Sequence, residues 1–112
     1  MFYLGGLHCQ LKLADILFNN FEYKTAAKIY SEYSSLSQNQ IENHAFCYFY
    51  INDFQNSIPF FKKALENKPK DFFLNYHYSI SLKSTGRYKS SKKILKDLYK
   101  KDSLNKHIVF KL

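Results

Sequence analysis

One segment of the chain recurs about 34 residues later, and this period limits the possible folds more than any other feature. Residues 52–54 ("NDF") align with residues 86–88 ("GRY") at an offset of 34, and residues 21–30 ("FEYKTAAKIY") have the same form, with Tyr23 matching Phe54 at an offset of 31. In each copy a turn leads to an aromatic residue, then to a small residue, then to an aromatic residue or leucine. A period of this length indicates stacked supersecondary units, each too small to bury its apolar face alone.

Helical start and stop signals lie at the edges of these units. Ser37 and Gln40 have the spacing of a capping box. Asp71 can cap the helix that follows it, and Gly86 can end that helix. We therefore expect helices at residues 7–19, 23–34, 39–51, 54–67, 72–84 and 88–101.

Two further features concern the second helix of each pair. Pro59 lies inside the segment 54–67, so that helix either starts near Ser57, which would place the proline in the first turn, or is kinked at the proline. Of the two we favour the late start. Small side chains recur where neighbouring helices would have to approach closely, at Ala26, Ser57, Ala64 and Ser91.

The alignment resembles the tetratricopeptide repeat, whose pattern is W-x2-L-G-x2-Y, then A-x3-F, then P. In the central unit these places hold Ile41, His44, Ala45, Tyr48, Ser57, Phe61 and Pro69, with Ala64 at a further small-residue place. Isoleucine replaces the tryptophan and histidine replaces the leucine. The flanking units match less fully, at Ala26 and Tyr30 in the first and at Gly86, Tyr88 and Leu95 in the third.

This resemblance implies an all-α fold, in which antiparallel helix pairs stack as a short right-handed α-solenoid. The whole chain, residues 1–112, would form one domain with repeats at about 7–37, 38–71 and 72–105. An apolar tail, "SLNKHIVFKL", would begin a partial extra helix at 104–112, and the similarly apolar start, "MFYLGGL", suggests self-association through the ends.

In the tetratricopeptide family the first helices of the pairs line a concave groove for a peptide or helix of a partner protein. Carried over, the groove residues are Leu11, Asp15, Phe18, Glu42, Phe46, Phe49, Tyr50, Phe73, Tyr76, Ile80 and Lys83. A well-known subgroup grips C-terminal carboxylates with Lys, Asn and Arg in this groove. Those places are here Leu11, Asp15, Phe46, Tyr76 and Ile80, so that clamp is absent and the groove is aromatic instead.

A lysine stripe forms the second candidate surface. Of the net charge of +8, residues 57–112 hold 14 basic and four acidic residues, while residues 1–56 hold three lysines and five acids. At helical spacing, one face of the last expected helix carries Lys89, Lys92, Lys93, Lys96 and Lys100. This basic face is either a solvated outer face or a ridge for nucleic acid, an acidic protein or anionic lipid. Arg87 is the one arginine, and base-reading proteins usually depend on arginine.

The leading hypothesis is a non-catalytic adaptor that holds a partner's apolar segment in the aromatic groove. The repeat order also resembles the chaperones of translocator proteins in bacteria with type III secretion, although those chaperones tend to be acidic. A helical protein that binds nucleic acid through its lysines is the third possibility.

No pattern indicates an enzyme, a cofactor or a metal. His44 and Cys47 lie three residues apart without further ligands, so we interpret His44 as a buried, hydrogen-bonded histidine in a packing place. The chain has no apolar run near the roughly 18 residues of a membrane span and no secretory signal at its start. With both cysteines expected to be reduced, we expect a cytoplasmic protein.

Overall fold

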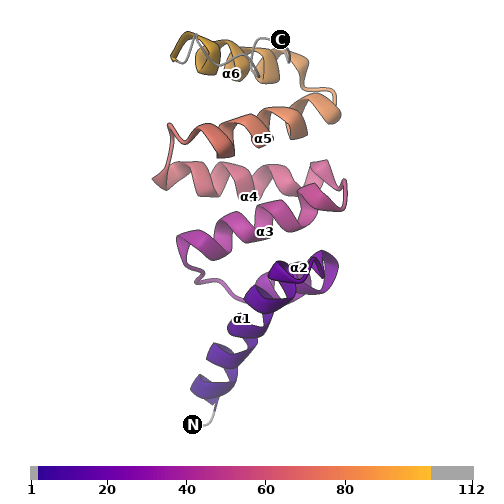
Figure 1. Cartoon of the computed structure of the whole chain (residues 1–112), viewed down its shortest axis with the longest axis vertical. Helices are drawn as coiled ribbons and strands as arrows, with labels where there is room; N and C mark the ends of the chain where they lie inside the picture. The colour runs from indigo at the N-terminus through magenta and orange to yellow at the C-terminus, as the bar shows by residue number, and fades with distance from the viewer. Residues whose placement is uncertain (1–2, 102–112) are drawn as a thin grey trace.

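The computed structural model describes residues 3–101, and this part of the chain consists of six α-helices without a strand. The helices are α1 (Tyr3–Asn19), α2 (Tyr23–Tyr30), α3 (Gln38–Tyr50), α4 (Phe54–Asn67), α5 (Phe72–Ser84) and α6 (Tyr88–Lys101). Each helix packs on the next one in the chain, and they follow one another along the long axis from α1 to α6 (Figure 1). The molecule extends 52 × 23 × 22 Å. The expected all-α stack of helix pairs is confirmed.

Most helix bounds agree with the expected ones, and those of α1 and α2 differ by several residues. The helices α5 and α6 begin and end as expected, α4 spans the whole segment 54–67, and α3 is shifted by one residue. The first helix begins at Tyr3 instead of residue 7, and α2 ends at Tyr30 instead of residue 34. After α2 the chain is rich in serine, and the Ser31 hydroxyl donates to the Lys28 carbonyl (2.7 Å), a local bond that competes with helix continuation. The extra helix expected at 104–112 lies outside the described residues.

The turn inside each helix pair has the same backbone geometry in all three pairs. Phe21, Asn52 and Gly86 have positive φ angles of 66°, 64° and 88°, and each lies two residues before the next helix. The amide that follows each of them donates to a carbonyl five residues back, over 2.8 Å in all three turns. A left-handed residue with this bond closes a helix end and satisfies its free carbonyls. The three turns therefore place the three units in the same register as the sequence alignment.

Side-chain caps fix where several of the helices begin. Ser37 and Gln40 form the complete capping box that the sequence predicts at the start of α3. Asp71 accepts from the Leu74 amide at 2.9 Å, as expected for the start of α5. Asp53 accepts from the Asn56 amide at 3.4 Å and so begins α4 at Phe54.

The late start expected for α4 is wrong, because Pro59 lies in its second turn. A proline there removes the bond that its missing amide would have made to the carbonyl of Gln55. Gln55 is exposed, so water can reach that carbonyl. The helix can therefore begin at its aspartate cap and still contain the proline.

Two core clusters each join one helix pair to the first helix of the next pair. The first contains Ala14, Ala26, Ala27, Tyr30 and Cys47, from α1, α2 and α3. The second contains Ile41, Ala45, Phe46, Phe61, Ala64 and Leu74, from α3, α4 and α5. The four small residues singled out in the sequence, Ala26, Ser57, Ala64 and Ser91, are all buried. Within the described range, no helix is both long enough and apolar enough to cross a membrane.

Replacing Gly86 tests the left-handed turn. No atom lies within 4 Å of the Cβ that an alanine would add, so the cost of Gly86→Ala is that of the backbone conformation alone. We expect a loss of about 1 kcal/mol in the free energy of unfolding. Gly86→Asn should lose less, because asparagine tolerates this conformation and already occupies the equivalent place at residue 52. Urea denaturation of the three proteins measures this order, and an alanine variant as stable as the asparagine variant would contradict it.

Candidate partner-binding surfaces

A continuous row of aromatic rings crosses the stack from α1 to α5. Its members, hereafter the aromatic row, are Phe18 on α1, Tyr23 on α2, Phe46, Phe49 and Tyr50 on α3, and Phe73, Tyr76 and His77 on α5. Neighbouring centroids lie 5.5 Å apart from Phe18 to Tyr23 and 4.9 Å from Tyr23 to Tyr50. The row thus links three helix pairs through side chains that contact one another.

Two rings of the row are exposed to solvent, and both pack on a third ring that is buried. Tyr50 is 44% exposed and Phe73 is 54% exposed, whereas Phe46 between them is 5% exposed. The Phe46 centroid lies 5.5 Å from Tyr50, 5.2 Å from Phe73 and 5.0 Å from Phe61 of the core. From the sequence, Phe46 could line the groove or pack between repeats; the structure places it in the core, beneath the two exposed rings.

Two members of the row, Tyr23 and His77, are not among the groove residues expected from the sequence. His77 lies 4.3 Å from Phe73 and 5.0 Å from Phe49, measured between ring centroids. Its Nδ1 lies 2.8 Å from the Phe73 carbonyl, and because a carbonyl only accepts, Nδ1 carries the proton. Burial lowers the pKa of His77, so the ring is neutral near pH 7. The alignment pairs Tyr23 with Phe54, and an aromatic residue lies five places before each of them, at Phe18 and Phe49. This spacing is the sequence signal for Tyr23, because both rings pack on that earlier ring.

Several expected groove residues also make contacts that join the helices. Asp15 accepts hydrogen bonds from the Tyr30 hydroxyl and from Gln40 (3.3 Å), which ties α1 to α2 and α3. Glu42 forms an ion pair with Lys68 (2.9 Å) between α3 and the end of α4. Leu11 and Phe18 pack against the core cluster of α1 to α3.

The remaining expected groove residues lie farther along α5. A small hollow between α5 and α6 is lined by Tyr76, Ile80 and Lys83 together with Ser79, Ser91 and Leu95. Tyr76 is a member of both the aromatic row and the lining of this hollow, and so connects the two.

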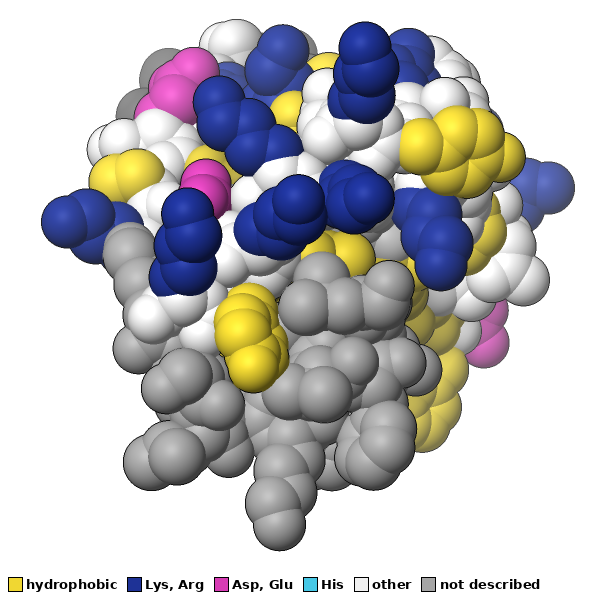
Figure 2. Space-filling view, turned by 90° about the horizontal axis from the view of Figure 1, so that it is seen from above, with side chains coloured by type: hydrophobic (Ala, Val, Ile, Leu, Met, Phe, Trp, Pro, Cys, Tyr) yellow, Lys and Arg dark blue, Asp and Glu magenta, His cyan; other side chains and the backbone are white. Residues whose placement is uncertain are grey.

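The five lysines of the basic face lie around one shallow hollow on α6. Its volume is about 410 Å³, and its lining is Lys89, Lys92, Lys93, Lys96, Asp97 and Lys100. Seen along the long axis from the α6 end, lysine and arginine side chains dominate the described part of this surface (Figure 2). No ion pair within residues 3–101 includes any of the five lysines.

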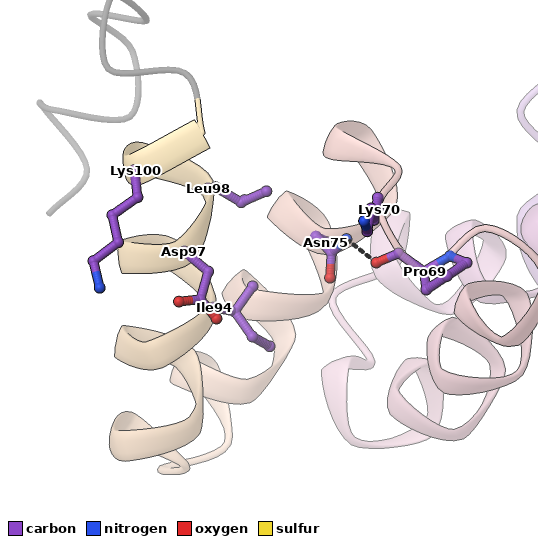
Figure 3. Close-up of a pocket in the computed structure, with 7 residues that line it drawn as sticks. All are labelled: Pro69, Lys70, Asn75, Ile94, Asp97, Leu98 and Lys100. Atoms are coloured by element: carbon purple, nitrogen blue, oxygen red, sulfur yellow. Dashed lines mark hydrogen bonds between the residues drawn. The ribbon is translucent and has the colours of Figure 1, made fainter.

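A second hollow of about 380 Å³ adjoins the basic face. It lies between α6 and the segment that leads into α5, and its lining is Pro69, Lys70, Asn75, Ile94, Asp97, Leu98 and Lys100 (Figure 3). The Asn75 amide donates to the Pro69 carbonyl (3.1 Å) and holds this segment against α5. Asp97 and Lys100 border both hollows, so the acid lies at the edge of the basic face.

His44 is buried as expected, but it lacks the expected hydrogen bond. The side chain is 3% exposed and its Nε2 has no partner among the described residues. The ring stacks on Phe60 with centroids 3.8 Å apart and borders a hollow of about 140 Å³ between α2, α3 and α4. Burial, assisted by the nearby Lys63 charge, lowers the pKa of His44 to about 4.

No described residues form a group of three or more histidine, cysteine or acidic side chains that could hold a metal ion. Cys9 is exposed, Cys47 is buried, and both are free thiols. Burial raises the pKa of the Cys47 thiol to about 12, so it stays protonated and unreactive near neutral pH.

Comparison with models of known protein families gives a match to part of the chain. Residues 42–71, which cover most of α3 and all of α4, match the family model described as tetratricopeptide repeat. No curated protein matches the chain. In that repeat, His44 occupies a place where the pattern has leucine.

Replacing His44 with leucine should change how stability depends on pH. Unfolded histidine binds a proton near pH 6.5 and folded His44 only near pH 4, so the native state loses stability as the pH falls between these values. The full loss from this residue is about 3 kcal/mol. His44→Leu should be at least as stable at pH 7.5 and should lose less on acidification, with His77 still contributing a slope in both proteins. Urea denaturation at several pH values measures this, and equal slopes would contradict it.

Proposed function

We propose that this tetratricopeptide-repeat protein is a non-catalytic scaffold that holds a segment of a partner protein along its aromatic row. Repeats of this family mediate protein–protein interactions and carry no chemistry of their own. The observation that supports the proposal is the pair Tyr50 and Phe73, two large rings exposed on a rigid, buried base. Aromatic anchors of this kind contribute most of the binding energy in protein interfaces.

The support beneath the exposed rings reduces the cost of binding. Phe46 contacts Tyr50, Phe73 and His77 at once, so each of the two exposed rings packs against a buried ring of the core on one side. Side chains that are already held in place lose little conformational freedom when a partner covers them. The row therefore offers a preorganised apolar surface that crosses from one helix pair to the next.

The chemistry of the row favours a partner segment with apolar side chains and few charges. The side chains of the row are uncharged aromatic rings. The neutral His77 adds one unprotonated nitrogen, Nε2, which can accept a hydrogen bond. Burial raises the pKa of the Tyr50 phenol, which stays neutral and can donate. An amphipathic helix or an extended apolar strand would match this combination.

The double variant Tyr50→Ala/Phe73→Ala tests the proposal. Affinity capture from native lysate should retain a protein partner on the wild type at both low and high salt, because apolar contacts are weakly screened. The double variant should lose that partner more than tenfold, since truncating an interface anchor costs about 2 kcal/mol or more. Unchanged thermal melting would show that the fold is retained.

A matched control removes two large apolar side chains that are even more exposed. Ile16→Ala/Tyr88→Ala lies outside the aromatic row, at residues that are 55% and 65% exposed. The control should keep the partner. The scaffold proposal fails if the Tyr50/Phe73 variant keeps every partner of the wild type, or if both variants lose the partner equally.

A further inference from the structure

We propose that the basic face of α6 binds single-stranded nucleic acid without reading its sequence, with the lysines contacting phosphates and Tyr88 stacking on a base. This site lies at the end of the stack, away from the α1 and α2 part of the aromatic row, and is independent of the scaffold function. It would take a strand of RNA or DNA as its ligand.

The lysines form one line rather than a scattered patch. Lys89 and Lys100 are eleven residues apart on α6, so the stripe extends about 16 Å along the helix. All five lysines border the same shallow hollow, where Asp97 is the single acid. A linear, flexible polyanion can follow such a stripe and neutralise several ammonium groups at once, with release of its own counterions.

Other anionic partners find less to bind on this face. The apolar side of α6 is already packed against α5, with Leu95 and Leu98 buried and Ile94 half-buried. The helix therefore has no free apolar side to insert into a membrane surface. A protein interface also needs buried anchors, since exposed ion pairs between lysine and carboxylate contribute little.

Tyr88 is exposed, whereas the residues in the equivalent places of the first two helix pairs pack on an aromatic ring. In the first two helix pairs, Tyr23 and Phe54 each pack edge-on against an aromatic residue five places earlier, Phe18 and Phe49. In the third pair the residue five places before Tyr88 is Lys83, and Tyr88 is left 65% exposed. It lies one helical turn before Lys92, beside the basic face. Lysines that follow a backbone next to an exposed ring are the combination used to bind single strands.

Because the basic residues of this face are lysines, we expect it to bind phosphates without distinguishing between bases. Lysine binds phosphate as a point charge, whereas reading base edges relies on the planar, bidentate arginine. Arg87, just before this helix, is the one arginine of the chain, and its Nη1 already donates to Gln55 (3.2 Å) and Thr85 (2.8 Å). Binding should therefore be indifferent to base sequence.

The first test is fluorescence anisotropy of the full chain with a labelled oligothymidylate of about 20 nucleotides. The logarithm of the binding constant should fall linearly with the logarithm of salt concentration, with a slope of about −3.5 if all five lysines contact phosphates. Lys92→Glu/Lys96→Glu should weaken binding more than tenfold and reduce the slope by about 1.4. Both lysines are exposed, so thermal melting should be unchanged.

The matched control is Lys24→Glu/Lys28→Glu on α2. It has the same four-residue spacing, the same exposure and the same change in net charge, at the other end of the stack. It should bind nearly as well as the wild type. Equal losses in the two double variants would mean that only the net charge matters, and the proposal would be overturned.

A second pair of variants tests the stacking. Tyr88→Ala should weaken binding about fivefold with the salt slope unchanged, because stacking adds affinity without releasing counterions. Tyr88→Phe keeps the ring and should bind like the wild type. An alanine variant that binds as well as the wild type would overturn the role of Tyr88.

Two other polyanions distinguish nucleic acid from competing partners. Polyglutamate of similar length and phosphatidylcholine vesicles containing phosphatidylserine offer carboxylates and a lipid surface instead. The proposal requires the oligonucleotide to bind more tightly than either one. Equal or tighter binding of polyglutamate would assign the face to an acidic protein, and tighter binding of vesicles would assign it to a membrane; either result overturns the proposal.

Discussion

The whole stack depends on the close approach of helices from neighbouring pairs, which small buried side chains allow. Ser57 on α4 and Ser81 on α5 are fully buried, and their hydroxyls hydrogen-bond to each other at 2.8 Å. At the preceding junction the equivalent places hold Ala26 and Cys47, which share a core cluster. A larger side chain at either junction would move the helices apart. The contact of Phe46 on α3 with Phe73 on α5 requires this spacing, so the aromatic row depends on residues that it does not touch.

Local signals in the sequence were sufficient to predict the helices and their stacking. The capping box at Ser37, the cap at Asp71 and the glycine turn at residue 86 act through neighbouring backbone groups, so their effect can be read from adjacent residues. The proline rule alone predicts a later start for α4 than the structure has, because the aspartate cap at residue 53 begins the helix at Phe54. A free carbonyl is tolerable when it is exposed, and exposure cannot be read from the local pattern.

The candidate site was less predictable, because it depends on which side chains meet across helices. Phe46 and Tyr50 are both aromatic and lie one turn apart, yet one is core and the other is exposed. Their difference arises from α5, which covers Phe46 through Phe73 and His77. His77 has no sequence neighbours that mark it, and it joins the row only through these contacts. His44 could be predicted as buried from its repeat place, but its missing hydrogen-bond partner could not.

One departure from the repeat separates the two candidate surfaces. The residue five places before the second helix of each pair is Phe18, then Phe49, then Lys83. The first two are members of the aromatic row and cover the ring that opens the next helix. With a lysine in the third place, no such ring packs on Tyr88, and the charge density of the chain rises along α6. Two candidate surfaces of opposite character can therefore arise from one repeated backbone, because a single place in the repeat decides whether the ring that opens the next helix is packed or exposed.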